Sequence, residues 1–376
     1  MSYAELPFDT QEALRDLRRW VECESPSWDA AAVSRMVGLA ASHFAALGAT
    51  VHMLPGERGF GECALADFAP DDPAPCVLVL CHCDTVHPIG TLATTLPWRE
   101  EDGRCYGPGL FDMKSGTYLA AAALAQLARA GLRPALPVRV LLTSDEESGT
   151  PSTRALIEAS ARRAKVVLVP EGAQPNGNLV SGRFPALRLR LWTHGRSSHA
   201  LLQRTEGRSA LLAMARLVQR IEALNGDGEV AYTVVLLESG RSISSVPVEA
   251  YAEVTCSARS EAALDAVIPR VEAIAREEGA DLTVGVKIRR PLWAPCEGDV
   301  ALQSLARGLM RELGIAADCE ALFGGSDGNL TGALGIPTLD GLGPVGADAH
   351  QLTENIEVAS LAPRCRLLAG LLATLT

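Results

Sequence analysis

The stretch VRVLLTSDEESGT, residues 138–150, begins as an apolar run and ends in three consecutive acids. Its first half is typical of a buried strand, and the Ser and Gly residues that follow favour a turn. Adjacent carboxylates repel one another, and the free-energy cost of that repulsion rises with burial. Asp145, Glu146 and Glu147 therefore form either a solvated turn or a group that a cation stabilises.

Strand and helix patterns alternate around this stretch. Helical patterns cover residues 10–22, 29–48, 116–131 and 152–163, and strand patterns cover residues 75–86, 137–147 and 164–172. This alternation predicts an α/β fold, with a mostly parallel or mixed sheet and helices on both faces. Ligands of such sheets bind beyond the carboxyl ends of the strands. The three strands end there in the polar triplets HCD, DEE and PEG.

The pattern changes near Phe184. Residues 186–290 follow a β-α-β-β-α-β order, which indicates a ferredoxin-like α+β unit, and Pro269 can kink its second helix. After Pro295 the alternation of helix and strand patterns resumes, with a helix at 299–314, a strand at 337–343 and a final helix. We therefore expect a discontinuous first domain, residues 1–184 and 295–376, and an inserted domain, residues 185–294.

Composition limits the classes of function. A chain of 376 residues with 48% hydrophobic residues is long enough for two cores. Its net charge of −11, with no basic block, disfavours nucleic acid and anionic membranes as partners. We see no signal-peptide pattern and no apolar run near the roughly 20 residues that span a bilayer. The 10 scattered cysteines suit a reducing compartment, so we expect a cytoplasmic protein.

The triplet HCD contains a histidine and a carboxylate on one face of a strand. Side chains alternate along a strand, so His82 and Asp84 share a face, and the carboxylate can orient the ring as a metal ligand. The alternative is a buried histidine that its neighbour satisfies. A metal site on Cys81 and Cys83 is less favoured, because no second cysteine pair lies nearby.

Three further candidates lie in loops or at strand ends. Asp112 lies in a Gly-rich turn before a helix, where it could instead be an N-cap. Glu171 could be a surface acid, and His350 a solvated loop histidine. Together with His82 and the acidic triplet, however, they give the imidazole and carboxylate mixture that suits zinc, with cobalt and manganese as alternatives.

These segments carry a family resemblance. In order, HCDTVHP, GPGLFDMKSG, TSDEESGT, VPEG, GRSSHA, GGSDGN and GADAHQLTENI resemble the motifs of the M20 metallopeptidases. The glutamate-carboxypeptidase (carboxypeptidase G2-like) branch is the most similar. The motifs run from residue 82 to residue 350, so the resemblance covers both expected domains. It implies a catalytic first domain and an inserted domain that acts as a lid and forms a homodimer.

The resemblance also implies two zinc ions per chain and a role for each site residue. His82, Asp112 and Glu171 would hold one zinc, and Asp112, Glu147 and His350 would hold the other. Asp84 would orient His82. Glu146 would act as general base and then as general acid, and His199 would stabilise the oxyanion.

The positions that bind the substrate carboxylate in many relatives carry other residues in this chain. Many relatives carry an Asn and an Arg that bind a substrate carboxylate, and here those positions are Ser244 and Ser257. A hydroxyl cannot replace a bidentate guanidinium. We take Arg259 and Arg290 as candidate substitutes, with Arg241 as a further one, and Gly325 and Ser326 of GGSDGN as substrate contacts.

These features and the resemblance predict a metal-dependent hydrolase of a small amide or peptide. The resemblance to the glutamate-carboxypeptidase branch implies one that releases a C-terminal, glutamate-type amino acid. One alternative is an N-acyl-amino-acid deacylase, or an aminohydrolase on an unusual small substrate. Another is a metal-holding binding protein without catalysis, which the retention of Glu146 disfavours.

Overall fold

The computed structural model describes residues 2–226 and 228–376, which divide into two compact units. Unit 1 comprises Met1–Gly182, Trp293–Ala321 and Ser326–Thr376, and unit 2 comprises Arg183–Leu292 and Leu322–Gly325. The sequence led us to expect an inserted domain at residues 185–294. The short return segment Leu322–Gly325 was not expected in it.

Unit 1 is built on a six-stranded mixed sheet in the order β1-β2-β6-β3-β7-β14. The strands are β1 (Thr50–Leu54), β2 (Cys63–Asp67), β3 (Cys76–His82), β6 (Val138–Thr143), β7 (Ala164–Leu168) and β14 (Thr338–Leu339). The pairings β6–β3, β3–β7 and β7–β14 are parallel, and β1–β2 and β2–β6 are antiparallel. The fold class predicted from the sequence is confirmed, and the antiparallel edge is an addition to it.

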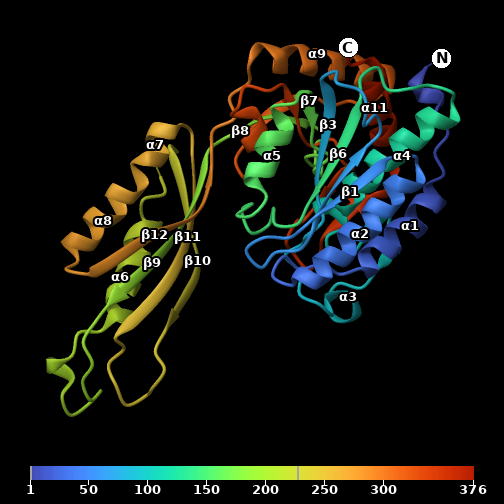
Figure 1. Cartoon of the computed structure of the whole chain (residues 1–376). Coiled ribbons are helices and arrows are strands. Elements are labelled where there is room, and N and C mark those ends of the chain that lie inside the picture. Colours follow the sequence, from blue (N-terminus) through green and yellow to red (C-terminus); the bar gives the residue numbers. More distant parts are fainter. Residues whose placement is uncertain (1, 227) are drawn as a thin grey trace. The chain divides into compact units, whose positions relative to one another are not determined.

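Helices cover both faces of this sheet (Figure 1). One face packs on a large core with α1 (Thr10–Glu22), α2 (Ala30–Ala46), α4 (Ser115–Arg129), α9 (Glu297–Glu312) and α11 (Leu361–Thr374). The other face packs on α5 (Arg154–Ala161) and α10 (Gly328–Gly332). Along β3, Val77 and Val79 enter the first core and Leu78 and Leu80 the second, which is why the strand is apolar throughout.

A small four-stranded sheet brings two distant segments together in the order β15-β16-β5-β4. Its strands are β4 (Arg99–Glu101), β5 (Arg104–Tyr106), β15 (Gly346–Ala347) and β16 (Asn355–Glu357). Tyr106 pairs with Asn355 in antiparallel register. Short helical turns complete the unit: η1 (Tyr3–Glu5), α3 (Thr91–Thr94), η2 (Leu110–Lys114) and η4 (Val358–Ser360). The strands β8 (Leu179–Arg183) and β13 (Cys319–Leu322) form a two-stranded ribbon.

Unit 2 has the strand order of a ferredoxin-like unit. Its antiparallel sheet runs β10-β11-β9-β12, with β9 (Ala186–His194), β10 (Val230–Ser239), β11 (Glu249–Ala258) and β12 (Asp281–Arg290). Its helical elements are η3 (Arg204–Glu206), α6 (Ala210–Glu222), α7 (Glu261–Asp265) and α8 (Val267–Glu277). Their apolar residues pack on one face of the sheet. The break between α7 and α8 falls at Ala266, one turn before Pro269, as expected of a residue without a backbone N–H.

Candidate metal centre

His82 is the last residue of β3, and its ring lies among three carboxylate residues. Nε2 is 2.9 Å from Oδ1 of Asp112 and 3.4 Å from Oε1 of Glu171. On the other side of the ring, Nδ1 is 3.0 Å from the carbonyl oxygen of Asp84 and 3.5 Å from its Oδ1. The ring is 2% exposed, so the strand end holds Nε2 in one direction, towards the two acids.

Asp112 presents its two carboxylate oxygens to two different histidines. Oδ1 faces His82, and Oδ2 is 3.1 Å from Nε2 of His350. The backbone of Asp112 is extended (φ −117°, ψ 95°), and no side-chain cap hydrogen bond is present at the start of α4. Asp112 is therefore not the N-cap that the sequence left open, and its carboxylate lies between the two imidazoles.

Glu147 completes the group on the side of His350. Its Oε2 is 3.0 Å from Nε2 of His350, while Oε1 is buried with no hydrogen-bond partner within the described part of the chain. A buried acceptor without a donor costs about 1–3 kcal/mol, which a bound cation would remove. The ligand atoms of His82, Asp112 and Glu147 all lie within 4.8 Å of one another. These nitrogen and oxygen donors fit a divalent metal of the zinc type.

Burial and mutual charge shift the pKa values of the group. Burial, and then the charge of Asp112, raise the pKa of Glu147 to about 7, and the same two causes raise the pKa of Glu171 to about 7. Hydrogen bonds to Asp112 and then Glu147 raise the pKa of His350 to about 11. Burial opposes ionisation of Asp112, but hydrogen bonds from His350 and His82 outweigh it and lower its pKa. The carboxylates thus crowd where only cations can offset their charge.

Asp84 fastens the acidic turn to His82. Its Oδ1 accepts a hydrogen bond of 3.1 Å from the Glu146 amide, and its Oδ2 accepts one of 3.1 Å from the Glu147 amide and one of 2.6 Å from Ser27 Oγ. The carboxylate is 1% exposed. One buried side chain therefore sets the position of both the histidine and the turn that carries Glu146 and Glu147.

Asp145, the first acid of the triplet, turns away into the fold. Its carboxylate accepts hydrogen bonds from the amide and hydroxyl of Ser152 at 2.6 and 2.7 Å, and from the amide and hydroxyl of Thr153. These donors allow a fully buried carboxylate and hold the loop that leads into α5. The three adjacent acids thus have three different environments.

Sequence reasoning missed two buried residues beside this group. Glu354 accepts hydrogen bonds from the amides of Phe111 (2.8 Å), Asp112 (3.1 Å) and Gly109 (3.1 Å) and lies 2.6 Å from Nε2 of His87. Both residues occur within the motif segments, but an acid and a histidine in loops look solvated in a sequence. Only the pairing of β5 with β16 brings Glu354 to the Asp112 turn, where it meets His87.

His199 lies in unit 2, on an exposed loop. Its Nδ1 accepts from the amides of Leu201 and Leu202 at 3.3 and 3.2 Å, so the neutral ring carries its proton on Nε2. The carbonyl of Ser244 accepts from the Ala200 amide at 2.9 Å, so Ser244 adjoins this loop.

The other predicted substrate contacts have partners within the fold. Arg259 donates to the Gly228 carbonyl at 2.9 Å, and its guanidinium lies 5.4 Å from the ring of Phe323. Ser257 Oγ donates to the Pro185 carbonyl at 3.1 Å. A Cβ on Gly325 would lie 3.0 Å from Cγ of the buried Arg290, so these two residues pack together in unit 2.

Ser326 belongs to unit 1. Its hydroxyl donates to Oδ2 of Asp340 at 2.7 Å and accepts from the Gly328 amide at 3.0 Å. The side chain is 2% exposed, so its hydroxyl is engaged in the loop itself.

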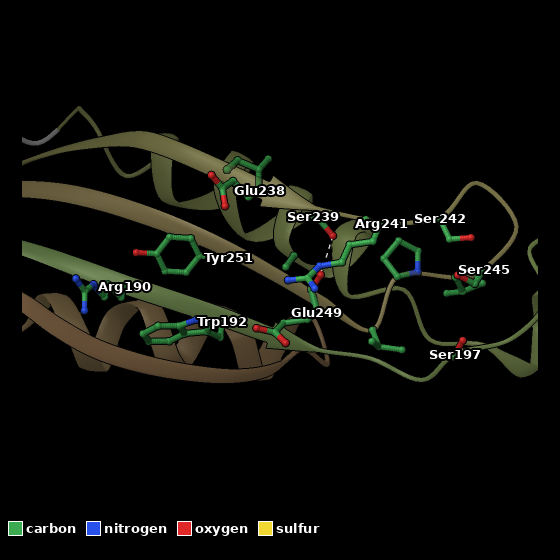
Figure 2. A pocket seen from close by; sticks show the side chains of 16 residues that line it. Arg190, Trp192, Ser197, Glu238, Ser239, Arg241, Ser242, Ser245, Glu249 and Tyr251 are labelled. Atoms are coloured by element: carbon green, nitrogen blue, oxygen red, sulfur yellow. Dashed lines mark hydrogen bonds between the residues drawn. The ribbon is translucent and has the colours of Figure 1, made fainter. Parts of the chain in front are cut away.

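A separate hollow of about 990 Å³ lies within unit 2 (Figure 2). Arg190, Trp192 and Tyr251 line it from the sheet, and Arg241 and Glu249 line it near the turn that carries Ser244. Trp192 and Tyr251 pack with ring centroids 5.3 Å apart. None of the metal-group residues lines this hollow, so its size says nothing about the metal centre.

Comparisons with known proteins agree with the chemistry of this group. The model of peptidase family M20/M25/M40 matches residues 78–374. Carboxypeptidase G2 from Pseudomonas sp. (strain RS-16) is 27% identical over 80% of this chain and 74% of its own. Succinyl-diaminopimelate desuccinylase from Alkalilimnicola ehrlichii is 28% identical over 73% of this chain and 76% of its own.

A solved structure shares the fold. The M20 family metallo-carboxypeptidase Sso-CP2 from Sulfolobus solfataricus aligns with a TM-score of 0.73 at 15% identity, over 97% of this chain and 99% of that one. No described helix is both long enough and apolar enough to cross a membrane.

Proposed function

Because the chain belongs to peptidase family M20/M25/M40, a family of metal-dependent peptidases and amidohydrolases, we propose that it hydrolyses a small amide or peptide at a two-metal centre. The observation that carries the proposal is Asp112, whose Oδ1 and Oδ2 face His82 and His350 respectively. A carboxylate that divides its oxygens in this way can bridge two metals. We assign one position to His82, Asp112 and Glu171, and the other to Asp112, Glu147 and His350.

Zinc is the metal we propose, with cobalt and manganese as alternatives. Zinc held by these residues would lower the pKa of a water molecule towards about 7 and polarise the scissile carbonyl. The chain supplies the rest of the chemistry. Asp84 keeps the His82 ring in one orientation through Nδ1, while its carboxylate holds the amides of the acidic turn.

Glu146 is the proton carrier in this proposal. It follows β6 on the same turn as Glu147 and is half-buried. As general base it accepts the proton of the attacking water, and as general acid it returns that proton to the leaving nitrogen. A single carboxylate can serve both steps, because the second regenerates the state that the first requires.

His199 is the proposed oxyanion donor. Because Nδ1 accepts two amide hydrogens, the neutral ring presents Nε2–H outward, which is the donor that a tetrahedral oxyanion needs. Unit 2 would then act as a lid that brings this donor to the carbonyl oxygen.

The substrate we favour is an N-acyl or peptidyl amino acid of the glutamate type, by similarity to carboxypeptidase G2. The similarity to succinyl-diaminopimelate desuccinylase supports an N-acyl-amino-acid deacylase as the second candidate. The serines at positions 244 and 257 keep both open, with Arg241, Arg259, Arg290, Gly325 and Ser326 as candidate contacts. A panel of acyl-glutamates, dipeptides and N-succinyl amino acids, each with added zinc, separates the two candidates; no turnover at all would favour a binding role.

We propose a homodimer through unit 2 and a cytoplasmic location, where the 10 free cysteines would stay reduced. Strand β10 is at the sheet edge and exposes Val235, Leu236 and Leu237, a surface that a second copy could cover. Val235→Lys should give a monomer by light scattering, while Val300→Lys, an equally exposed site on α9, should not. A wild-type monomer with full activity would contradict the dimer.

A further inference from the structure

We propose that Glu354, together with His87, is a positioning residue that sets the second metal position, the one formed by Asp112, Glu147 and His350. The inference rests on the proposed two-metal centre and goes beyond it. Glu354 touches none of the reacting atoms. It acts through the backbone of Asp112 and through the segment that carries His350.

The Glu354 carboxylate receives four donors in a buried site. Oε1 accepts from the Phe111 and Asp112 amides, and Oε2 accepts from the Gly109 amide and lies 2.6 Å from Nε2 of His87. Glu354 is 1% exposed and His87 is 5% exposed. Three backbone amides of the Asp112 loop thereby donate to one side chain, and charge-assisted bonds of this kind are the strong ones.

The loop departs from regular geometry at two positions that matter for the site, Gly109 and Asp112. Gly109 has φ 67°, and a Cβ there would lie 2.3 Å from Cγ2 of Thr85. Asp112 itself lies outside helical geometry. The hydrogen bonds of η2, from the Lys114 amide to the Gly109 carbonyl and from the Ser115 amide to the Leu110 carbonyl, do not use the amide of Asp112. That amide donates to Glu354 instead, so Glu354 helps to fix the position of Asp112.

The same residue reaches the segment of His350. Glu354 follows His350 in one loop, its amide donates to the Gln351 carbonyl at 3.2 Å, and its carbonyl accepts from the Gly107 amide at 3.4 Å. His350 has φ 67°, so its backbone also depends on its neighbours. The hydrogen bonds of Glu354 thus link the Asp112 loop to the His350 loop, next to the paired strands β5 and β16.

The two metal positions depend on this clamp to different degrees. His82, Glu171 and Glu147 end or follow strands of the large sheet and need no support from Glu354. The first position takes only Asp112 from the clamped loops, whereas the second takes both Asp112 and His350. Loss of the clamp should therefore weaken the second position more than the first.

Glu354→Gln tests this selectivity. An amide offers one accepting oxygen where the carboxylate offers two, so at least one backbone donor loses its partner. We expect the first zinc equivalent to keep its affinity and the second to weaken about 10-fold, at the lower end of what outer ligand supports contribute. The visible spectrum of the second Co²⁺ equivalent should change as well. Calorimetric titration of metal-free protein gives both affinities without any assay of activity.

Asp299→Asn is the matched control. Asp299 is also a fully buried carboxylate of unit 1 and accepts from the Cys296 and Thr338 amides at 2.6 and 2.8 Å. It should lower the melting temperature and leave both metal affinities and the Co²⁺ spectrum unchanged. If Glu354→Gln does not fold, two variants of His87 take its place. His87→Gln keeps an N–H donor and should weaken binding of the second metal slightly. His87→Leu removes the donor and should weaken it more.

The inference would be overturned if Glu354→Gln bound each of the two metals as tightly as the wild-type protein does. It would also be overturned if the variant weakened the binding of both metals by the same factor. Wild-type protein that binds a single metal would overturn the two-metal proposal itself, and that result is visible before any variant is made.

Discussion

The Glu147 amide donates a hydrogen bond of 3.1 Å to Oδ2 of Asp84, the residue whose carbonyl and carboxylate also face the ring of His82. His82, the proposed ligand at the end of β3, and Glu147, the proposed ligand after β6, are therefore positioned by one buried side chain. The parallel pairing of the two strands, with His82 opposite Thr143, makes this possible. The relative position of His82 and Glu147 thus depends on the register in which β3 and β6 pair.

Asp84→Asn should reduce metal affinity about 10–100-fold, because an amide cannot accept from both turn amides and Ser27 while it keeps the ring oriented. Calorimetric titration with zinc measures the loss. Ser27→Ala removes one donor to Asp84 and should have a smaller effect in the same direction. Unchanged affinity in Asp84→Asn would show that the Asp84 carbonyl alone orients His82.

The adjacent glutamates should respond differently to the same substitution. Glu146→Gln should keep its metals and its KM and lose about 10²–10⁴-fold in kcat, since only the proton carrier is removed. Glu147→Gln should instead weaken the second metal, and added zinc should restore part of its activity. Paired metal analysis and kinetics decide the matter. A fully active Glu146→Gln, beside a Glu147→Gln that keeps its metals and is inactive, would reverse the assignment.

His199→Ala should lower kcat about 10²–10³-fold, the usual effect of losing one oxyanion donor, and leave metal content unchanged. His194→Ala provides the matched control, because His194 belongs to the same unit and its Nε2 bonds only to Thr283 at 3.1 Å among the described contacts. Steady-state kinetics with one substrate measures both variants. An equal loss in the two would indicate a general effect on unit 2.

Metal affinity should rise steeply with pH. The pKa values of Glu147 and Glu171 are raised to about 7, so in the metal-free protein both hold protons below pH 7, and a metal must displace them. His350, with its pKa raised to about 11, must also lose a proton at neutral pH. Zinc binding should therefore release protons, and affinity should fall as pH drops below 7. Calorimetry in buffers of different ionisation enthalpy counts the protons, and zero release would refute the coupling.

Much of the fold could be predicted because its long elements have a strong hydrophobic period. The helical pattern at residues 10–22 coincides with α1, and the β-α-β-β-α-β pattern at residues 186–290 begins and ends with β9 and β12. The strands of the small sheet could not be predicted, because two or three residues carry no period. The antiparallel edge formed by β1 and β2 was also missed, because each strand has only five residues and β1 is mostly exposed.

The residues of the site likewise divide into those that the sequence could bring together and those that it could not. The ends of parallel strands must meet at one edge of a sheet, so residues such as His82 and Glu171 could be brought together from the sequence. Glu354 and His87 could not, because their importance depends on which amides they meet. Arg259, taken as a substrate contact because it lies two residues after Ser257, stays a prediction; its neighbours in the structure are a carbonyl and two aromatic rings.

The number of metals bound per chain tests the central claim most directly. Metal-free protein titrated with zinc, followed by elemental analysis after removal of excess metal, should retain two zinc ions per chain, because Asp112 faces a separate histidine with each oxygen. Asp112→Asn should retain fewer. Saturation of the wild-type protein at a single zinc ion, with full hydrolytic activity, would contradict the bridging role of Asp112 and with it the two-metal account.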